Sequence, residues 1–236
     1  MSKLAVVTGA GSGVGQAVAL MLAERGWDVA VIGRRTSALD ETVALSKKFK
    51  SKLIPFACDV GKEADVIKMA KAVQDQLGVP QALVNSAGVN VPKRRLDVLS
   101  DADFRSVIEI NLMGTYWCVH AFLPQMREAK NGTIVNIVSD AGVRATPAAG
   151  ASYIASKFGQ RGLAQAINLE ERGNGIRCCS VCPGEINTPI LEKRPVPPPP
   201  EARVKMLQAE DVARCVLLAI ELPPRAVVEE LLVRPA

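Results

Sequence analysis

The stretch "KLAVVTGAGSGVGQAVALMLAER" (residues 3–25) decides the fold, because it joins an apolar run, a glycine cluster and a helical pattern without interruption. Residues 3–8 are apolar and β-branched, as in a buried strand, and the residues after the cluster repeat apolar side chains with a helical period. Gly9, Gly13 and Gly15 have the spacing G-x-x-x-G-x-G. Glycines let the backbone approach a phosphate, whose charge the N-terminus of the following helix favours. The spacing matches neither the G-x-G-x-x-G fingerprint nor a P-loop.

Short apolar runs recur along the chain and alternate with helical stretches. The runs are nearly continuous in apolar character, as expected of strands that are buried on both faces. We therefore expect an α/β fold in three layers, a doubly wound parallel sheet of about seven strands with helices on both faces. The predicted strands are 3–8, 28–33, 52–58, 82–86, 132–139, 175–182 and 226–233, and the predicted helices are 15–25, 37–49, 63–77, 104–126 and 209–222.

No internal repeat or clear boundary divides the chain, so we expect one domain over residues 1–236. The segment "RPVPPPPEARV" (194–204) breaks the strand–helix pattern, because its prolines favour polyproline II and exclude a helix. We interpret it as part of a stiff substrate loop over about residues 188–206. The alternative is a ligand for a proline-reading domain. Ligands of parallel sheets bind beyond the carboxyl ends of the strands, so the residues after each strand are candidates for the site.

Two arginines follow the second predicted strand, in "VAVIGRR" (29–35). A site that reads an unphosphorylated ribose places an acid here to accept a hydrogen bond from the 2′-hydroxyl. Arg34 and Arg35 instead suit a 2′-phosphate, which guanidinium groups bind through bidentate hydrogen bonds. A solvated cationic turn is the alternative. The pattern favours NADP(H) as the cofactor over NAD(H).

A tyrosine and a lysine lie four residues apart in "ASYIASKFG" (151–159). Four residues make about one helical turn, so Tyr153 and Lys157 share a helix face. A cation close to the phenol would lower its pKa from about 10 toward neutral pH. Ser139 ends a different predicted strand, where its hydroxyl can donate to a developing alkoxide. We predict that Tyr153 transfers a proton; a chance pair on one helix face is the alternative.

Six motifs occur in the order and spacing that resemble those of the short-chain dehydrogenase/reductase family, and together they extend over about residues 3–222. The resemblance implies a single Rossmann-type domain that binds a dinucleotide and transfers a hydride between a nicotinamide and a carbonyl or alcohol. The motifs are the glycine loop, "NSAG" (85–88), Asn111, Ser139, Tyr153-x-x-x-Lys157 and "PGEINT" (183–188).

The family's residue roles carry over to the matching positions. The resemblance implies that Tyr153 is the general acid/base, that Ser139 hydrogen-bonds the reacting oxygen and that Lys157 holds the nicotinamide ribose. It implies that Asn111 helps to anchor a proton-relay water, and a buried structural hydrogen bond is the alternative for this residue. The implied cofactor contacts, besides Arg34 and Arg35 after the second strand, are Gly9, Ser12, Gly13, Val14, Gly15, Asp59, Val60, Asn85, Ala87, Gly88, Tyr153, Lys157, Pro183, Gly184, Ile186 and Thr188.

Several features depart from the family's pattern. Ser139 and Tyr153 are fourteen positions apart, one more than the commonest spacing, so the loop between them must accommodate an extra residue. Ser86 replaces the second asparagine of the family's "NNAG". The ending "VVEELLVRPA" lacks the glycine-rich segment common in tetrameric members, so we expect either a homodimer or a homotetramer. Tyr116 is assigned to packing or to a subunit contact.

The composition favours a cytoplasmic protein without nucleic-acid or membrane partners. The net charge is +5, but the basic residues are scattered, and the densest cluster, "PKRRLD" (92–97), is interpreted as a solvated basic face. We see no signal peptide and no apolar run of the roughly 18 residues that a spanning helix needs. Cys178, Cys179 and Cys182 include one C-x-x-C without a second ligand pair, and His120 is the only histidine. We therefore expect buried thiols and no metal site.

The expected substrate is a small, modestly apolar carbonyl compound or secondary alcohol. Its cleft should lie between Ser139 and Tyr153 on one side and the substrate loop on the other. The rival interpretation is a non-catalytic dinucleotide-binding regulator, which a damaged Ser–Tyr–Lys set would mark; here the set is intact. The apolar neighbours of the cleft are Val143, Ile190 and Leu191.

Overall fold

Seven parallel strands form one sheet in the computed structural model, which describes residues 3–236. The strands are β1 (Lys3–Thr8), β2 (Trp27–Gly33), β3 (Leu53–Ala57), β4 (Ala82–Asn85), β5 (Gly132–Ile137), β6 (Ile176–Pro183) and β7 (Glu230–Val233). Their order is β3-β2-β1-β4-β5-β6-β7, so the chain winds outward in both directions from β1 and β4. The predicted doubly wound sheet is confirmed. Residues 1 and 2 of the domain predicted over 1–236 lie outside the described residues.

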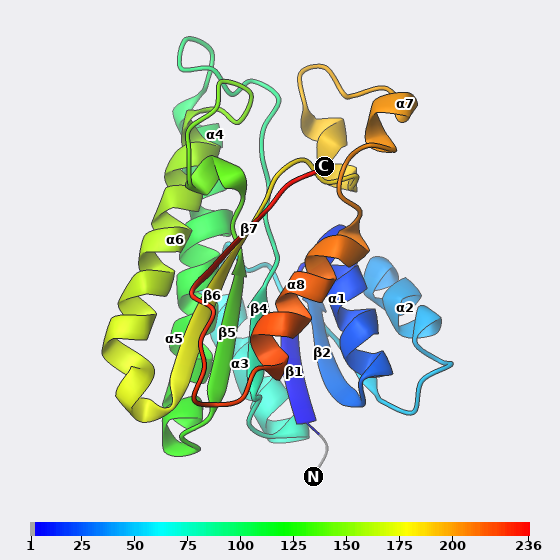
Figure 1. Ribbon diagram of the computed structural model, residues 1–236, viewed down its shortest axis with the longest axis vertical. Helices are drawn as coiled ribbons and strands as arrows, with labels where there is room; N and C mark the ends of the chain where they lie inside the picture. Colours follow the sequence, from blue (N-terminus) through cyan, green and yellow to red (C-terminus); the bar gives the residue numbers. More distant parts are fainter. Residues whose placement is uncertain (1–2) are drawn as a thin grey trace.

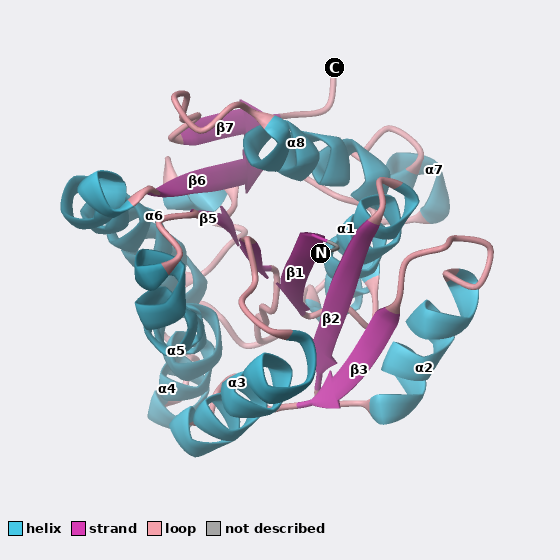
Figure 2. Cartoon of the chain, turned by 90° about the horizontal axis from the view of Figure 1, so that it is seen from below, coloured by secondary structure: helices cyan, strands magenta, loops and turns pink. Residues whose placement is uncertain are grey.

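Helices cover both faces of the sheet (Figure 1). They are α1 (Gly13–Glu24), α2 (Thr36–Leu45), α3 (Glu63–Leu77), α4 (Asp101–Ile108), α5 (Gly114–Glu128), α6 (Ala151–Glu171), α7 (Pro200–Arg203) and α8 (Ala209–Glu221). Figure 2 shows α1, α2 and α8 on one side of the sheet and α3, α4, α5 and α6 on the other. The expected three layers are therefore present.

Side chains of the central strands are buried on both faces, which explains their continuous apolar character. In β1, Ala5 and Val7 pack against α1 and α8, whereas Val6 packs into the core under α3 and α5. All three side chains are fully buried. A fully buried valine contributes about 1.5–3 kcal/mol relative to an exposed one, so the two cores hold the helical layers onto the sheet.

Several predicted elements differ from the structure, among them the helix predicted over 37–49, which ends at Leu45, and the strand predicted over 132–139, which ends at Ile137. The last strand begins at Glu230 rather than at 226, because β7 is a half-exposed edge strand with partial pairing before that point. The single helix predicted over 104–126 is two helices, α4 and α5, joined by a π-helical turn over Glu109–Met113. The expectation that the prolines exclude a helix is wrong for α7, which begins at Pro200, because proline is well tolerated in a first helical turn.

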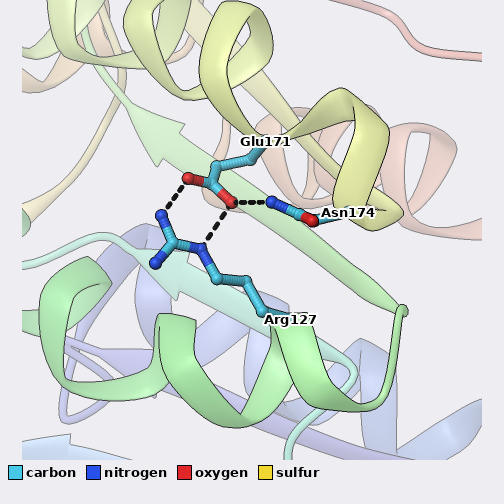
Figure 3. A network of polar contacts seen from close by, with 3 residues as sticks. All are labelled: Arg127, Glu171 and Asn174. Atoms are coloured by element: carbon cyan, nitrogen blue, oxygen red, sulfur yellow. Dashed lines mark hydrogen bonds and ion pairs between the residues drawn. The ribbon is translucent and has the colours of Figure 1, made fainter.

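The lower ends of α5 and α6 are joined by a charged network (Figure 3). Arg127 of α5 donates two hydrogen bonds to the carboxylate of Glu171, the last residue of α6, one of them from Nε over 2.7 Å. Asn174 donates to the same carboxylate over 2.9 Å. Glu171 is 2% exposed, whereas Arg127 is exposed and Asn174 is half-buried, so the network reaches from a buried carboxylate to the surface.

The cysteines are free, and all except the half-buried Cys215 are buried. Burial raises the pKa of Cys182 to about 11, so this group is a thiol at neutral pH. The prediction of buried thiols on β6 is confirmed. Within residues 3–236, no helix is both long enough and apolar enough to cross a bilayer.

Candidate active site

The glycine loop between β1 and α1 has no room for side chains. Gly9 has a φ of +67°, and a Cβ there would lie 2.9 Å from the Cα of Ala87. A Cβ on Gly15 would overlap the carbonyl of Gly9. Ser12 precedes α1 without making a capping hydrogen bond, and α1 has no acidic residue in its first turn, which includes Val14. The first N–H groups of α1 are therefore available to an anion.

The same loop meets the segment that follows β6. Gly13, with a φ of +56°, faces Thr188, whose Cγ2 lies 3.2 Å from the position of a Cβ on Gly13. Thr188 therefore lies beside the glycine loop at the start of the substrate loop.

The residues between β6 and Thr188 follow the carboxyl edge of the sheet. Pro183 is the last residue of β6, and Gly184 donates from its N–H to the carbonyl of Val233 over 2.8 Å. Ile186 forms an isolated bridge with Leu207. This arrangement carries the implied cofactor contacts of the segment toward Thr188, which lies beside the glycine loop.

The two arginines predicted to read a 2′-phosphate follow β2 at the same edge. Arg34 and Arg35 are both exposed, and Arg35 directly precedes α2. Their side chains make no ion pair among the contacts of the described residues. The geometry leaves both guanidinium groups available at the edge where an adenosine ribose would lie.

Two of the implied cofactor contacts, Asp59 and Val60, follow β3. Asp59 accepts a hydrogen bond from the N–H of Gly61 over 3.2 Å, which forms a tight turn. Val60 is buried, and a Cβ on Gly114 would lie 2.7 Å from the Val60 carbonyl. Val60 thus packs closely under the start of α5, next to the exposed end of β2.

The motif after β4 is fixed by its neighbours on both sides. Asn85 donates from Nδ2 to Oδ1 of Asn136 on β5 over 2.9 Å. The N–H groups of Ser86 and Ala87 both donate to Oγ1 of Thr8 over 3.1 Å. The threonine therefore holds the loop after β4 against the end of β1, where the glycine loop begins.

Tyr153 and Ser139 come together from α6 and from the loop after β5. Ser139 precedes a 3-10 turn over Asp140–Gly142, and its Oγ accepts from the N–H of Ala141 over 3.1 Å. Its hydroxyl also forms a hydrogen bond that lowers the pKa of the Tyr153 phenol. The extra residue in the connecting loop therefore does not separate the pair.

The pKa of Tyr153 differs in direction from the sequence expectation. Burial raises it to about 12, which outweighs the lowering by Ser139. The charge of Asp140 raises it further, whereas the charges of Arg94 and Arg194 lower it. Lys157 is not among these causes. The expectation that its ammonium lowers the pKa of Tyr153 is therefore wrong. The ammonium lies over the ring face, 5.5 Å from the centroid, and desolvation of the phenol dominates.

Lys157 is buried and oriented by two acceptors. Its Nζ donates to the carbonyl of Ile137 over 2.8 Å and to Oε1 of Gln160 over 2.7 Å. A Cβ on Gly88 would lie 3.7 Å from this nitrogen, so the glycine leaves the ammonium accessible from that side. Burial lowers the pKa of Lys157 to about 7.

Asn111 lies in the π-helical turn, and its side chain is fully engaged. Oδ1 accepts from the N–H of Val89 over 2.8 Å, and Nδ2 donates to the Val89 carbonyl and to Oγ of Ser156, each over 3.0 Å. The amide thus ties the loop after β4 to α6, as the structural alternative expected. The backbone carbonyl accepts from the hydroxyl of Thr115 over 2.8 Å.

Arg94 is a functional candidate that the sequence did not indicate. It was placed on a solvated basic face, but it is 6% exposed. Its guanidinium donates to the carbonyls of Val91, Ala148 and Lys193, over 2.8 Å for the first and 3.2 Å for the second. These carbonyls belong to three separate loops around Tyr153. No local pattern in "PKRRLD" indicates which arginine is buried.

The apolar neighbours of the cleft are only partly where the sequence placed them. Ile190 is 38% exposed and Val143 is half-buried, so both can line a cleft. Leu191 is 3% exposed and packs inside the substrate loop.

Comparisons with known proteins agree with this geometry. The family model described as short chain dehydrogenase matches residues 3–196. An uncharacterized oxidoreductase of Staphylococcus aureus (strain MRSA252) is 33% identical over 233 residues, which cover 99% of this chain and 97% of the relative. The alcohol dehydrogenase of the archaeon Thermococcus sibiricus, complexed with 5-hydroxy-NADP, has a TM-score of 0.89 at 28% identity, with 99% of this chain and 97% of that chain covered. A metagenomic short-chain oxidoreductase in complex with NADP has a TM-score of 0.86 at 31% identity and the same coverage. The chain therefore belongs to the short-chain dehydrogenase/reductase family of oxidoreductases.

Proposed function

We propose that this protein is an NADP(H)-dependent oxidoreductase that interconverts a small, modestly apolar carbonyl compound and its secondary alcohol. The observation that carries the proposal is the meeting of Tyr153, Ser139 and Lys157 at the carboxyl edge of the sheet. The glycine loop, with its uncapped helix N-terminus, lies at the same edge. A proton donor, a hydroxyl and a cation beside a phosphate site are the parts that hydride transfer to a carbonyl needs.

The proposed proton donor is the phenol of Tyr153. A half-buried phenol with a pKa of about 12 is protonated at neutral pH, so it can donate from Oη to the oxygen of a carbonyl under reduction. In the opposite direction the phenolate accepts the alcohol proton. Ser139 donates a hydrogen bond to the same oxygen, and Lys157 holds the nicotinamide ribose with its remaining N–H. When it is bound, the nicotinamide supplies or accepts the hydride.

The proposed cofactor is NADP(H), with NAD(H) as the weaker alternative. The residues fit the dinucleotide, because Gly9 and Gly15 let the loop pack tightly against its neighbours and the first N–H groups of α1 are uncapped. Arg34 and Arg35 supply two exposed cations for the 2′-phosphate. Two solved relatives support this choice, since one is complexed with 5-hydroxy-NADP and the other with NADP.

We also propose that the whole chain is one domain, with residues 188–206 as the substrate loop, and that it assembles as a homodimer or homotetramer. The contact of Gly13 with Thr188 supports the placement of the loop beside the nicotinamide end of the cofactor site. Exposed aromatic side chains on α5 and α6 support assembly.

The replacement Tyr153→Phe tests the proposed function. We expect it to lower kcat by at least about 10³-fold, because the general acid is lost, while the dissociation constant for NADPH changes less than about threefold. Turnover is followed by the absorbance of the reduced nicotinamide over a panel of ketones, aldehydes and secondary alcohols. Retained turnover in the variant would contradict the role of Tyr153. A kcat/KM at least about tenfold higher with NADH than with NADPH would overturn the cofactor choice.

A further inference from the structure

A chain of buried hydrogen bonds leads from Lys157 away from the reacting atoms. Lys157 Nζ donates to Oε1 of Gln160 over 2.7 Å, and Nε2 of Gln160 donates to Oγ1 of Thr115 over 2.6 Å. The Thr115 hydroxyl donates to the backbone carbonyl of Asn111 over 2.8 Å. Gln160 is fully buried, so no bulk water competes for its amide. These contacts connect α6 to the π-helical turn through the side chains of Gln160 and Thr115 and the backbone carbonyl of Asn111.

The direction of each hydrogen bond in this chain is determined. An ammonium only donates, so the carbonyl oxygen of Gln160 must face Lys157, and its NH₂ must face Thr115. Lys157 has three N–H groups, of which one goes to Gln160 and one to the Ile137 carbonyl. One N–H remains for the side where Gly88 leaves room. Gln160 therefore fixes the direction in which the last N–H points.

The hydrogen bond to the neutral amide of Gln160 does not compensate the charge of Lys157. The titratable groups that face it are Tyr153 on its own helix and Cys182 on β6, and neither carries a charge at neutral pH. Burial lowers the pKa of the lysine to about 7, and a neutral amide opposes this lowering far less than a carboxylate would. The ammonium thus depends on Gln160 for position rather than for charge.

We propose that Gln160 is a positioning residue that aligns Lys157 with the cofactor ribose and couples it to Asn111 through Thr115. This inference rests on the proposed function for the role of the ribose. The link itself can be measured on the protein without any cofactor.

Two replacements at position 160 separate positioning from packing. Gln160→Met keeps the volume but removes the acceptor, and Gln160→Glu keeps an acceptor and adds a charge. If Gln160 only fills space, the methionine variant should behave normally and the buried glutamate should be harmful. If Gln160 positions Lys157, the methionine variant should be the harmful one and the glutamate variant should behave nearly normally. The glutamate still accepts a hydrogen bond from the ammonium, and the methionine cannot.

The readout is the titration of Lys157, followed by NMR on protein with ¹³C-labelled lysine and assigned with Lys157→Met. A buried lysine loses its charge as the pH rises through its pKa, so we expect the transition to move to higher pH in Gln160→Glu and to lower pH in Gln160→Met. The dissociation constant for NADPH at about pH 6 should rise roughly tenfold in Gln160→Met and change little in Gln160→Glu. A titration that is the same in both variants and in the unchanged protein would overturn the proposal, as would equal loss of NADPH binding in both.

Matched variants guard against indirect effects. Gln165→Met alters an exposed glutamine on the same helix and should change neither measurement. Thr115→Ser keeps the hydroxyl and should behave like the unchanged protein, whereas Thr115→Val should reproduce part of the Gln160→Met effect. If the unchanged protein binds neither NADPH nor NADH, the proposed function fails, and the lysine titration still decides the role of Gln160.

Discussion

Arg94 shows how one buried side chain can organise several loops around a reacting group. Its guanidinium donates to carbonyls of the loop after β4, the loop before α6 and the substrate loop. The backbone conformation of Gly150 makes room for it, since a Cβ there, at a φ of +81°, would lie 2.5 Å from the Cβ of Arg94. Its charge also acts on Tyr153, where it lowers the pKa of the phenol against the effect of burial.

The replacement Arg94→Met should therefore loosen the substrate loop. Three carbonyls would lose their donor, so we expect the free energy of unfolding to fall by about 2 kcal/mol and KM for the carbonyl substrate to rise more than kcat falls. Trypsin cleavage after Lys193, mapped by mass spectrometry, should become at least several-fold faster. Cleavage of the loop needs no substrate, so it can be measured before any is identified.

Arg95→Met is the matched control for this prediction. Arg95 is the next residue, is exposed and pairs only with Asp97 on the surface over 3.1 Å. Exposed pairs contribute at most about 1 kcal/mol, so neither stability nor loop cleavage should change much. Equal cleavage rates in the two variants would show that Arg94 does not hold the loop.

Site residues could be predicted from the sequence where they contact residues close to them in the chain. Tyr153 and Lys157 are one helical turn apart, so their spacing alone indicates a shared face. Gln160 adds a further position to that face, and the polar stripe it completes is a signal that sequence reasoning missed. The burial of Arg94 and the raised pKa of Tyr153 depend on loops far away in the chain. The sequence near Arg94 and Tyr153 therefore does not indicate that these side chains are shielded from solvent.

Among the elements, α5 and α6 are joined at their lower ends by Arg127 and Glu171 (Figure 3). The hydrogen bonds from Arg127 lower the pKa of the Glu171 carboxyl from its ordinary 4.5, and burial opposes them. A lowered pKa in the folded state means that the stabilisation is present above pH 4.5 and disappears as the pH falls through the folded value. The network should therefore stabilise the fold at neutral pH and not in acid.

Glu171→Gln should lower the free energy of unfolding by about 2 kcal/mol at neutral pH, because it leaves the arginine without its buried anion. The difference from the unchanged protein should shrink as the pH falls below the ordinary 4.5 of the carboxyl, and it should disappear below the lowered pKa of the folded state, where the carboxyl is protonated in both states. Urea unfolding at several pH values measures it. Glu170→Gln, at an exposed position next to it, is the control, and equal losses in the two variants at neutral pH would refute the prediction.

The bounds of the elements were predictable where burial dominates and less so elsewhere. Fully buried β1 was predicted over its observed residues, because every side chain after Lys3 is apolar or enclosed. The edge strand β7 was predicted four residues too long, since the apolar side chains at 226–228 do not require ladder pairing. The π-helical turn around Asn111 was not predicted, because it arises from the contacts of that asparagine with Val89 and Ser156.

For the whole molecule, the order of strands and helices was enough to predict where the site lies. Parallel strands place their carboxyl ends along one edge, so the residues after β1, β2, β4, β5 and β6 had to approach each other. The sequence therefore indicated the general location of the site. It did not indicate the shape of the cleft, because the loop over 188–206 is positioned by long-range contacts such as those of Arg94.

Assembly is a property of the whole molecule that the surface makes testable. Tyr116 of α5 and Phe158 of α6 are each 42% exposed, and the tyrosine stacks on His120 with ring centroids 5.7 Å apart. Both helices lie on the same side of the sheet (Figure 2), and exposed aromatic side chains that gather on one face are typical of contact surfaces. Both interpretations of Tyr116, packing and a subunit contact, are compatible with a ring that stacks on His120 and is partly open to solvent. We therefore propose that this face joins two copies of the chain.

The double replacement Tyr116→Asp with Phe158→Asp should convert the assembly into monomers, because two charges would have to be desolvated at the contact. Light scattering coupled to size-exclusion chromatography gives the mass directly, at several protein concentrations. Leu45→Asp is the matched control, since this side chain is 53% exposed on α2 at the opposite side of the sheet. A monomeric mass for the unchanged protein, or an unaltered assembly in the double variant, would exclude this face as the interface. If the control alone dissociates, the contact lies on the layer of α1, α2 and α8 instead.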